Sequence, residues 1–211
     1  MNKRKLYYLV GKVCILSGEC LLLFILIINA ADYIRNRNSL KQFDELLVLQ
    51  QAEQNKEIAS TAALQKRAST EKQKDNQDED APIMAKLSIG KIELTEAVKE
   101  GTDQNALRSA LGHMEDTAFP GEIGNCVIAG HRNYVFGRYF NRLDEMETGD
   151  EIVITTETGT YTYTVFETQV VLPEDISVLE QTQDSRLTLI TCTPLFVGSH
   201  RLIIKAALNS W

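Results

Sequence analysis

A cysteine and an arginine near the end of the chain have the residue types and spacing for acyl-transfer chemistry. Cys192 ends the apolar run 187–191. Because Pro194 cannot continue a β ladder, the thiol should lie at the rim of a strand. Arg201 opens the next apolar run, so two antiparallel strands would place it beside Cys192. A neighbouring cation favours the thiolate and supplies donors for an oxyanion, which predicts a cysteine nucleophile.

A thiolate also needs a proton partner, and the chain has three histidines. His131 follows the apolar run 126–129 and Gly130, so it too should lie at a strand end. His200 adjoins Arg201, and its side chain should point to the opposite face. We therefore predict His131 as the acid or base. The simpler alternative is that the cysteine is an inert core residue and the histidine is only hydrogen-bonded.

Further residues could contact a substrate. Asn133, Tyr134 and Arg138 follow His131 and could border a groove, although a solvated loop is the simpler interpretation. His113 could also line the site, and a structural role in a turn is the alternative. Asn133 and His113 are our candidate substrate-binding residues.

These side chains need strands to position them, and residues 81–211 are rich in strand patterns. Strand-like runs are 85–89, 125–129, 150–156, 160–172, 186–191 and 201–208. Residues 156–159 supply a hairpin turn, and only 103–111 and 176–181 look helical. Short strands separated by turn signals favour a closed or nearly closed barrel over a βαβ sheet.

The N-terminal part of the chain predicts a membrane anchor. Residues 13–31 are nearly all apolar or small, and at about 1.5 Å per residue they match a hydrocarbon layer of roughly 30 Å. The basic residues at 3–5 favour a cytoplasmic N-terminus (1–12), which leaves the catalytic domain outside the cell. Glu19 is the ionisable residue of this single span. A cleaved signal peptide is the alternative, although residues 28–31 match a cleavage site only in part.

Residues 32–80 predict a polar linker that is partly helical. Leu40, Phe43 and Leu47 indicate a helical stripe, which fades after Leu64 into a highly charged tail. The tail is too polar to bury a core and should be disordered. A partner-binding role for residues 40–49 is the alternative.

Overall charge and cysteine usage exclude several classes. The 211 residues carry a net charge of −7, so no basic face is expected for nucleic acid. Two of the four cysteines lie in the apolar segment, so the even count makes no disulfide framework. Zinc binding by Cys126, His131, Cys192 and His200 lacks paired ligand spacing. We expect no metal and no required cofactor; calcium dependence stays open.

Taken together, the motifs resemble those of sortases, the cysteine transpeptidases of Gram-positive cell envelopes. Residues 188–194 with 201–204 are similar to the cysteine motif and arginine strand of the family. Residues 117–121 with 127–132 are similar to the segment that carries its catalytic histidine. The resemblance covers residues 83–208 in the family's order. It implies a mostly β fold, a closed eight-stranded barrel with short helices.

The resemblance also implies site roles. Cys192 would attack the Thr carbonyl of an LPxTG-like sorting signal in a secreted protein and form a thioacyl enzyme. His131 would protonate the leaving amine and later deprotonate the incoming amine of a peptidoglycan precursor or a pilin. Arg201 would hold the substrate and stabilise the oxyanion, with Thr191 assisting beside the nucleophile.

The subclass that the chain most resembles is class D. The N-terminal anchor, the compact barrel and the stretch 101–113 are similar to class D enzymes, whereas 191–194 with 199–201 are also similar to the pilin-polymerising class C enzymes. Class D implies anchoring of proteins to peptidoglycan, and pilus assembly is the second choice. A non-enzymatic membrane-tethered interaction protein and a metal-binding sensor are the alternatives from other classes.

Overall fold

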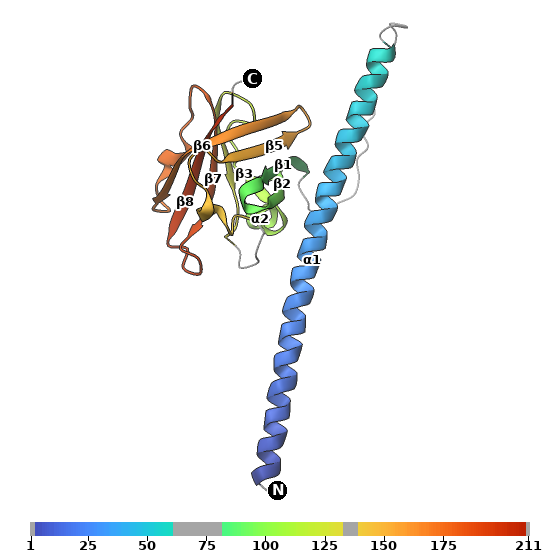
Figure 1. The fold of residues 1–211 in the computed structure, drawn as a ribbon, viewed down its shortest axis with the longest axis vertical. Coiled ribbons are helices and arrows are strands. Elements are labelled where there is room, and N and C mark those ends of the chain that lie inside the picture. The colour runs from blue at the N-terminus through green and yellow to red at the C-terminus, as the bar shows by residue number, and fades with distance from the viewer. Residues whose placement is uncertain (1–2, 61–81, 133–138, 210–211) are drawn as a thin grey trace.

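The computed structural model describes residues 3–60, 82–132 and 139–209 of the chain. One long helix, α1 (Lys3–Ser60), lies beside a barrel of strands (Figure 1). The strands are β1 (Ile83–Ile89), β2 (Leu94–Glu100), β3 (Leu111–His113), β4 (Gly124–Ala129), β5 (Glu151–Thr156), β6 (Thr160–Val171), β7 (Ser185–Thr193) and β8 (His200–Leu208). The short helices are η1 (Gly90–Ile92), α2 (Gln104–Ser109), η2 (Leu143–Glu145) and η3 (Ile176–Leu179).

The eight strands close in the order β1-β2-β3-β4-β7-β8-β6-β5. This confirms the predicted fold class, a mostly β closed barrel with short helices. The pairs β2–β3 and β4–β7 are parallel, and the other six pairs are antiparallel. Parallel pairing of β4 with β7 matters for the site, because it brings the carboxyl ends of both strands to the same end of the barrel.

Alternating side chains fill the barrel. Leu187 and Leu189 of β7 are fully buried. Leu189 pairs with Ile204 of the neighbouring strand β8, which is also buried. Tyr163 and Phe140 are among the largest buried side chains. Each such side chain contributes roughly 1.5–3 kcal/mol by leaving water. Because every second residue of β7 faces this core, the residues between them, including Cys192, face outward.

The sequence analysis did not predict two of the strands, β2 and β3. β2 contains Glu96 and Lys99, and both are buried, with 1% and 2% of their surface exposed. Polar residues at buried positions remove the alternating pattern by which a half-buried strand is identified. β3 has only three residues, which is too short for any periodicity.

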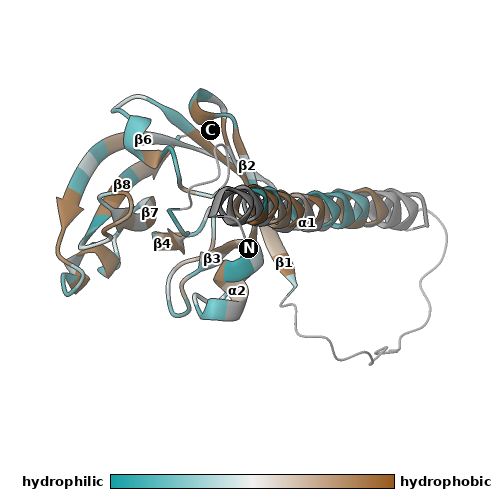
Figure 2. Cartoon of the chain, turned by 90° about the horizontal axis from the view of Figure 1, so that it is seen from below, coloured by the Kyte–Doolittle hydropathy of each residue, from teal (hydrophilic) through white to brown (hydrophobic). Residues whose placement is uncertain are grey.

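Helix α1 joins two segments that the sequence analysis treated separately, the apolar segment and the partly helical linker. It covers the apolar segment 13–31 and continues through residues 32–60 of the predicted linker, because neither Gly nor Pro occurs between Gly18 and Pro82 to end it. Figure 2 shows both hydrophobic and hydrophilic residues along α1. Within the helical residues that the structure describes, no stretch is long and apolar enough to cross a bilayer, so the predicted transmembrane helix is not confirmed.

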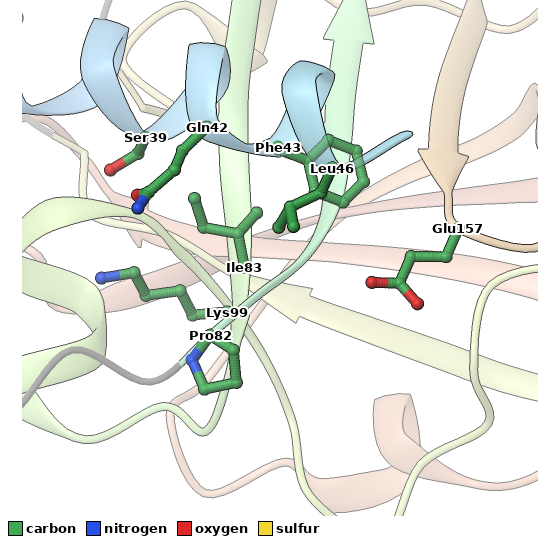
Figure 3. Close-up of a pocket in the computed structure, with 8 residues that line it drawn as sticks. All are labelled: Ser39, Gln42, Phe43, Leu46, Pro82, Ile83, Lys99 and Glu157. Atoms are coloured by element: carbon green, nitrogen blue, oxygen red, sulfur yellow. The ribbon is translucent and has the colours of Figure 1, made fainter. Parts of the chain in front are cut away.

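The segment predicted to be a helical linker packs against the protein's own barrel. Phe43 is 1% exposed, and Asp44 forms an ion pair with Lys86 of β1. Farther along α1, the Gln50 amide donates to the Glu157 carboxylate at 3.1 Å. Figure 3 shows side chains that line a small cavity between α1 and the barrel, with Phe43 coming from α1 and Ile83 from β1. These contacts fix α1 on the β1–β2–β5 side of the barrel, away from the strands β4, β7 and β8.

Candidate active site

Three neighbouring strands bring the predicted catalytic residues to one end of the barrel. β7 lies between β4 and β8, parallel to the first and antiparallel to the second. The end of β4 therefore lies beside the end of β7 and the beginning of β8. His131 follows β4, Cys192 lies near the end of β7, and Arg201 is the second residue of β8.

Cys192 and Arg201 are directly opposite each other in the β7–β8 ladder. Opposite residues of antiparallel strands have Cα atoms about 4.5–5.5 Å apart and side chains on the same face. The thiol is free and partly exposed. Arg201 Nη1 donates to the carbonyl oxygens of Gly198 and His200, each at 3.1 Å, which holds the guanidinium at the β7–β8 turn.

The turn between β7 and β8 passes close to the thiol. Gly198 has φ +64°, a conformation that other residues rarely adopt, and a Cβ placed there would lie 3.6 Å from the Cβ of Cys192. The turn is closed by the amide nitrogens of Val197 and Gly198, which donate to the Pro194 carbonyl. This glycine lets the backbone turn next to the nucleophile.

His131 lies level with Cys192 on the other side. The β4–β7 ladder pairs Ala129 with Ile190, and the Gly130 amide donates to the Ile190 carbonyl at 3.0 Å. Two residues further in this register stand His131, just beyond β4, and Cys192 on β7. His131 is exposed, and its carbonyl accepts from the Phe140 amide at 3.1 Å.

Thr191 and Arg132 join the same two strand ends through side chains. Thr191 is 2% exposed, and its hydroxyl donates to the Gly130 carbonyl at 2.8 Å. This bond holds the residue that follows β4 against β7, next to Cys192. Arg132 donates to the Thr193 hydroxyl at 2.8 Å and forms an ion pair with Asp144 at 2.8 Å. The sequence analysis did not single out Arg132, although it directly follows His131.

The structure places His113 away from this group. It lies on β3 opposite Ile128, is 1% exposed, and its Nδ1 bonds the Glu100 carboxylate at 3.0 Å. Its Nε2 lies 3.0 Å from the Ala118 carbonyl, and the ring stacks on Phe119 with centroids 5.1 Å apart. Every polar atom of the ring is therefore engaged inside the fold. Asn133, Tyr134 and Arg138 lie outside the described residues.

Cys126 is unsuited to nucleophilic chemistry. It lies on β4 with 1% of its surface exposed, and burial, reinforced by the charges of Glu100 and Glu122, raises the pKa of its thiol to about 12. It is protonated at neutral pH. Within the described part of the chain, no three His, Cys, Asp or Glu side chains are grouped as metal ligands.

A partly exposed thiol on a strand whose neighbours carry an imidazole and a guanidinium at the same end of the barrel can perform covalent acyl transfer. The thiolate can attack a carbonyl carbon, the imidazole can transfer protons, and the guanidinium can stabilise the oxyanion. The β7–β8 ladder fixes Cys192 opposite Arg201, and His131 follows β4 at the same end of the barrel.

Comparisons with known proteins point to the same chemistry. The family model described as the sortase domain matches residues 87–209. Sortase D of Bacillus subtilis (strain 168) is 36% identical over 115 residues, which cover 54% of this chain and 56% of that protein. The chain spans about half the length of the curated relatives it matches.

Solved structures that resemble this chain are of the same family. One described as that of a Clostridium perfringens sortase D5 transpeptidase superimposes with a TM-score of 0.65 at 32% identity, covering 83% of this chain and 99% of that one. Sortase A from Corynebacterium diphtheriae gives a TM-score of 0.59 at 36% identity, covering 63% of each chain.

Proposed function

The chain belongs to the sortase family, and we propose that it is a cysteine transpeptidase that cleaves an LPxTG-like sorting signal after its Thr. The observation that carries this proposal is the position of Cys192 between two strand neighbours, with Arg201 opposite it on β8 and His131 level with it beyond β4. The partly exposed thiol can reach a peptide lying across this end of the barrel.

The reaction follows from these positions. The Cys192 thiolate attacks the Thr carbonyl carbon, and the resulting oxyanion is stabilised by N–H groups of Arg201. When the Thr–Gly bond breaks, protonated His131 gives its proton to the leaving amine, and a thioester remains on Cys192. An incoming amine then attacks the thioester, its proton returns to His131, and a new amide bond releases the thiolate.

The acceptor that we propose is an amine of a peptidoglycan precursor, as expected for a class D enzyme. This is supported by the likeness to the sortase D5 transpeptidase, 99% of which is covered by the superposition. A pilin lysine is the acceptor that a class C enzyme would use instead. Comparing the two amines in the same assay distinguishes these subclasses.

We also propose that the enzyme acts at the outer surface of the cell membrane, on secreted proteins. The supporting observation is a set of exposed apolar side chains on the first half of α1. They include Leu21, Leu22, Leu23 and Phe24, each 59–63% exposed. Water disfavours so large an apolar surface, whereas lipid accepts it. Fractionation of cells that express the full chain should recover it with membranes; recovery in the soluble fraction would contradict this localisation.

A peptide assay tests the proposed activity. The full chain, purified in detergent, is mixed with a fluorogenic LPxTG or LPxTA peptide, with and without an added amine. We expect cleavage after Thr and, with the amine present, a new amide product identified by mass spectrometry. Cys192→Ala should remove both products. Full turnover in that variant would refute the proposal.

A further inference from the structure

We infer that Arg132 is a positioning residue: its guanidinium joins the end of β4 to the end of β7 and thereby holds His131 level with Cys192. This inference deepens the proposed function and rests on it. It assigns to Arg132 a role in the geometry of the reacting pair, without contact to the substrate.

The contacts of Arg132 reach two separate elements. Nη1 donates to the hydroxyl of Thr193, the residue after the nucleophile, at 2.8 Å. Nη2 lies 2.8 Å from a carboxylate oxygen of Asp144 on η2. Two bonds in different directions leave a planar guanidinium little rotational freedom, so the backbone at residue 132 is held as well.

The bonds around the reacting pair follow one register. The β4–β7 ladder pairs Cys126 with Leu187, and the same offset relates Gly130 to Thr191 and Arg132 to Thr193. The Thr191 hydroxyl donates to the Gly130 carbonyl, and Arg132 donates to the Thr193 hydroxyl, each at 2.8 Å. Residues 131 and 192 thus lie between two side-chain bonds that join their strands. Both bonds lie beyond Ala129, the last paired residue of β4.

The two side chains of the Arg132–Asp144 ion pair differ in burial. The Arg132 side chain is 8% exposed, whereas Asp144 is 53% exposed. Because Asp144 remains hydrated, loss of the arginine leaves no buried carboxylate behind, and the main effect should fall on the strand ends. A lysine carries its donors on one nitrogen and lacks the planar fork of a guanidinium, so it should hold the two partners less rigidly.

The expected kinetic signature is a loss of kcat at unchanged KM. His131 transfers protons during bond breaking and bond formation, so its distance from Cys192 affects the chemical steps and not the binding of the peptide. A misplacement of about 1 Å in such a site can cost up to about 100-fold in rate.

Five variants of the full chain test this inference in the peptide assay. Arg132→Met removes both bonds and keeps an unbranched side chain, and Arg132→Lys keeps the charge. Thr193→Val removes only the hydroxyl acceptor, and its matched control Thr193→Ser keeps it. The fifth variant combines Arg132→Met with Thr193→Val. Tm is recorded for each, and kcat and KM are measured well below the lowest Tm.

We expect Arg132→Met to lower kcat by about 10–100-fold at unchanged KM, and Arg132→Lys to restore part of the loss. Thr193→Val should lower kcat while Thr193→Ser matches the wild type. The double variant should be no worse than Arg132→Met, because Arg132→Met already removes the only one of these bonds that Thr193→Val removes. If Arg132→Met does not fold, the two Thr193 variants decide.

Several outcomes would overturn the inference. They are wild-type kcat in Arg132→Met, equal kcat in Thr193→Val and Thr193→Ser, complete rescue by lysine, and a rise in KM at constant kcat. An inactive wild type refutes the proposed function itself, which separates that failure from a failure of the Arg132 role.

Discussion

Cys192 and Arg201 lie directly opposite each other on two antiparallel strands, so their side chains share one face of the sheet. We predict that Arg201→Met lowers kcat/KM by about 100–1,000-fold, the usual cost of removing one oxyanion donor. Arg186→Met is the matched control, because Arg186 lies at the other end of β7 and pairs with Asp184. Steady-state peptide cleavage measures both. A loss in Arg186→Met equal to that in Arg201→Met would contradict the assignment.

The two cysteines of the barrel should behave oppositely. Cys192→Ala should lower kcat by roughly 1,000-fold or more, as removal of a nucleophile does. Cys126→Ala should keep kcat, because its thiol is buried and protonated, and should only lose about 1 kcal/mol of folding stability from the small cavity. Peptide cleavage and urea denaturation give the two quantities. Loss of activity in Cys126→Ala at urea concentrations below its unfolding midpoint would contradict this prediction.

Substitutions at His131 and His113 should affect different quantities, the first kcat and the second folding stability. His131→Gln should lower kcat by about 100-fold or more, with little change in stability because the residue is exposed. His113→Phe should instead lower the free energy of unfolding by about 1–3 kcal/mol, since it removes the buried bonds to Glu100 and the Ala118 carbonyl. Its kcat should stay within the wild-type range. A specific loss of kcat in His113→Phe would restore His113 as a substrate-binding residue.

Alkaline pH should destabilise the fold through Cys126. Burial raises the pKa of its thiol from 9.0 to about 12, so the unfolded chain loses this proton first. The contribution is fully present below pH 9 and is lost as the pH rises towards 12, by up to about 4 kcal/mol. Burial also raises the pKa of Tyr163 to about 12, which adds a smaller loss of the same sign.

Cys126→Ala isolates this effect. Urea denaturation at pH 8, 9, 10 and 11 should give a shallower decline in stability for the variant than for the wild type. Parallel declines would show that ionisation of Cys126 does not contribute.

Docking of α1 on the barrel should depend on Phe43. Phe43→Ala should lower the free energy of unfolding by about 3 kcal/mol, because the side chain is 1% exposed. Leu49→Ala on the same helix is the matched control, since Leu49 is 61% exposed and should change stability by less than about 0.5 kcal/mol. Equal effects would mean that α1 does not pack on the barrel through this face.

Much of the barrel was predictable because β5 and β6 alternate and β4, β7 and β8 contain short apolar runs. The hairpin at 156–159 joins β5 and β6 as predicted, and the runs at 125–129, 186–191 and 201–208 are β4, β7 and β8. β2 was missed because Glu96 and Lys99 occupy buried positions. The closure into eight strands was predicted by the family resemblance, since β2 and β3 carried no pattern of their own.

The candidate site was predictable where it depended on strand ends. Cys192 and Arg201 flank a short loop with Gly198, so their juxtaposition followed from an antiparallel pair. Arg132 could not be identified in the same way, because its partners Thr193 and Asp144 are set by the parallel β4–β7 register and by η2. The sequence predicted helix in both parts of α1 but not their continuity, because the composition changes near residue 32 while neither Gly nor Pro occurs between Gly18 and Pro82.

The most direct test of the central claim is intact-mass spectrometry of the enzyme after brief incubation with an LPxTG-like peptide and no amine acceptor. We predict a mass increase equal to the acyl fragment ending in Thr, located on Cys192 by proteolytic mapping, and released as an amide when an amine is added. A chain that cleaves the peptide without forming this adduct, or that carries it on another residue, would contradict the account.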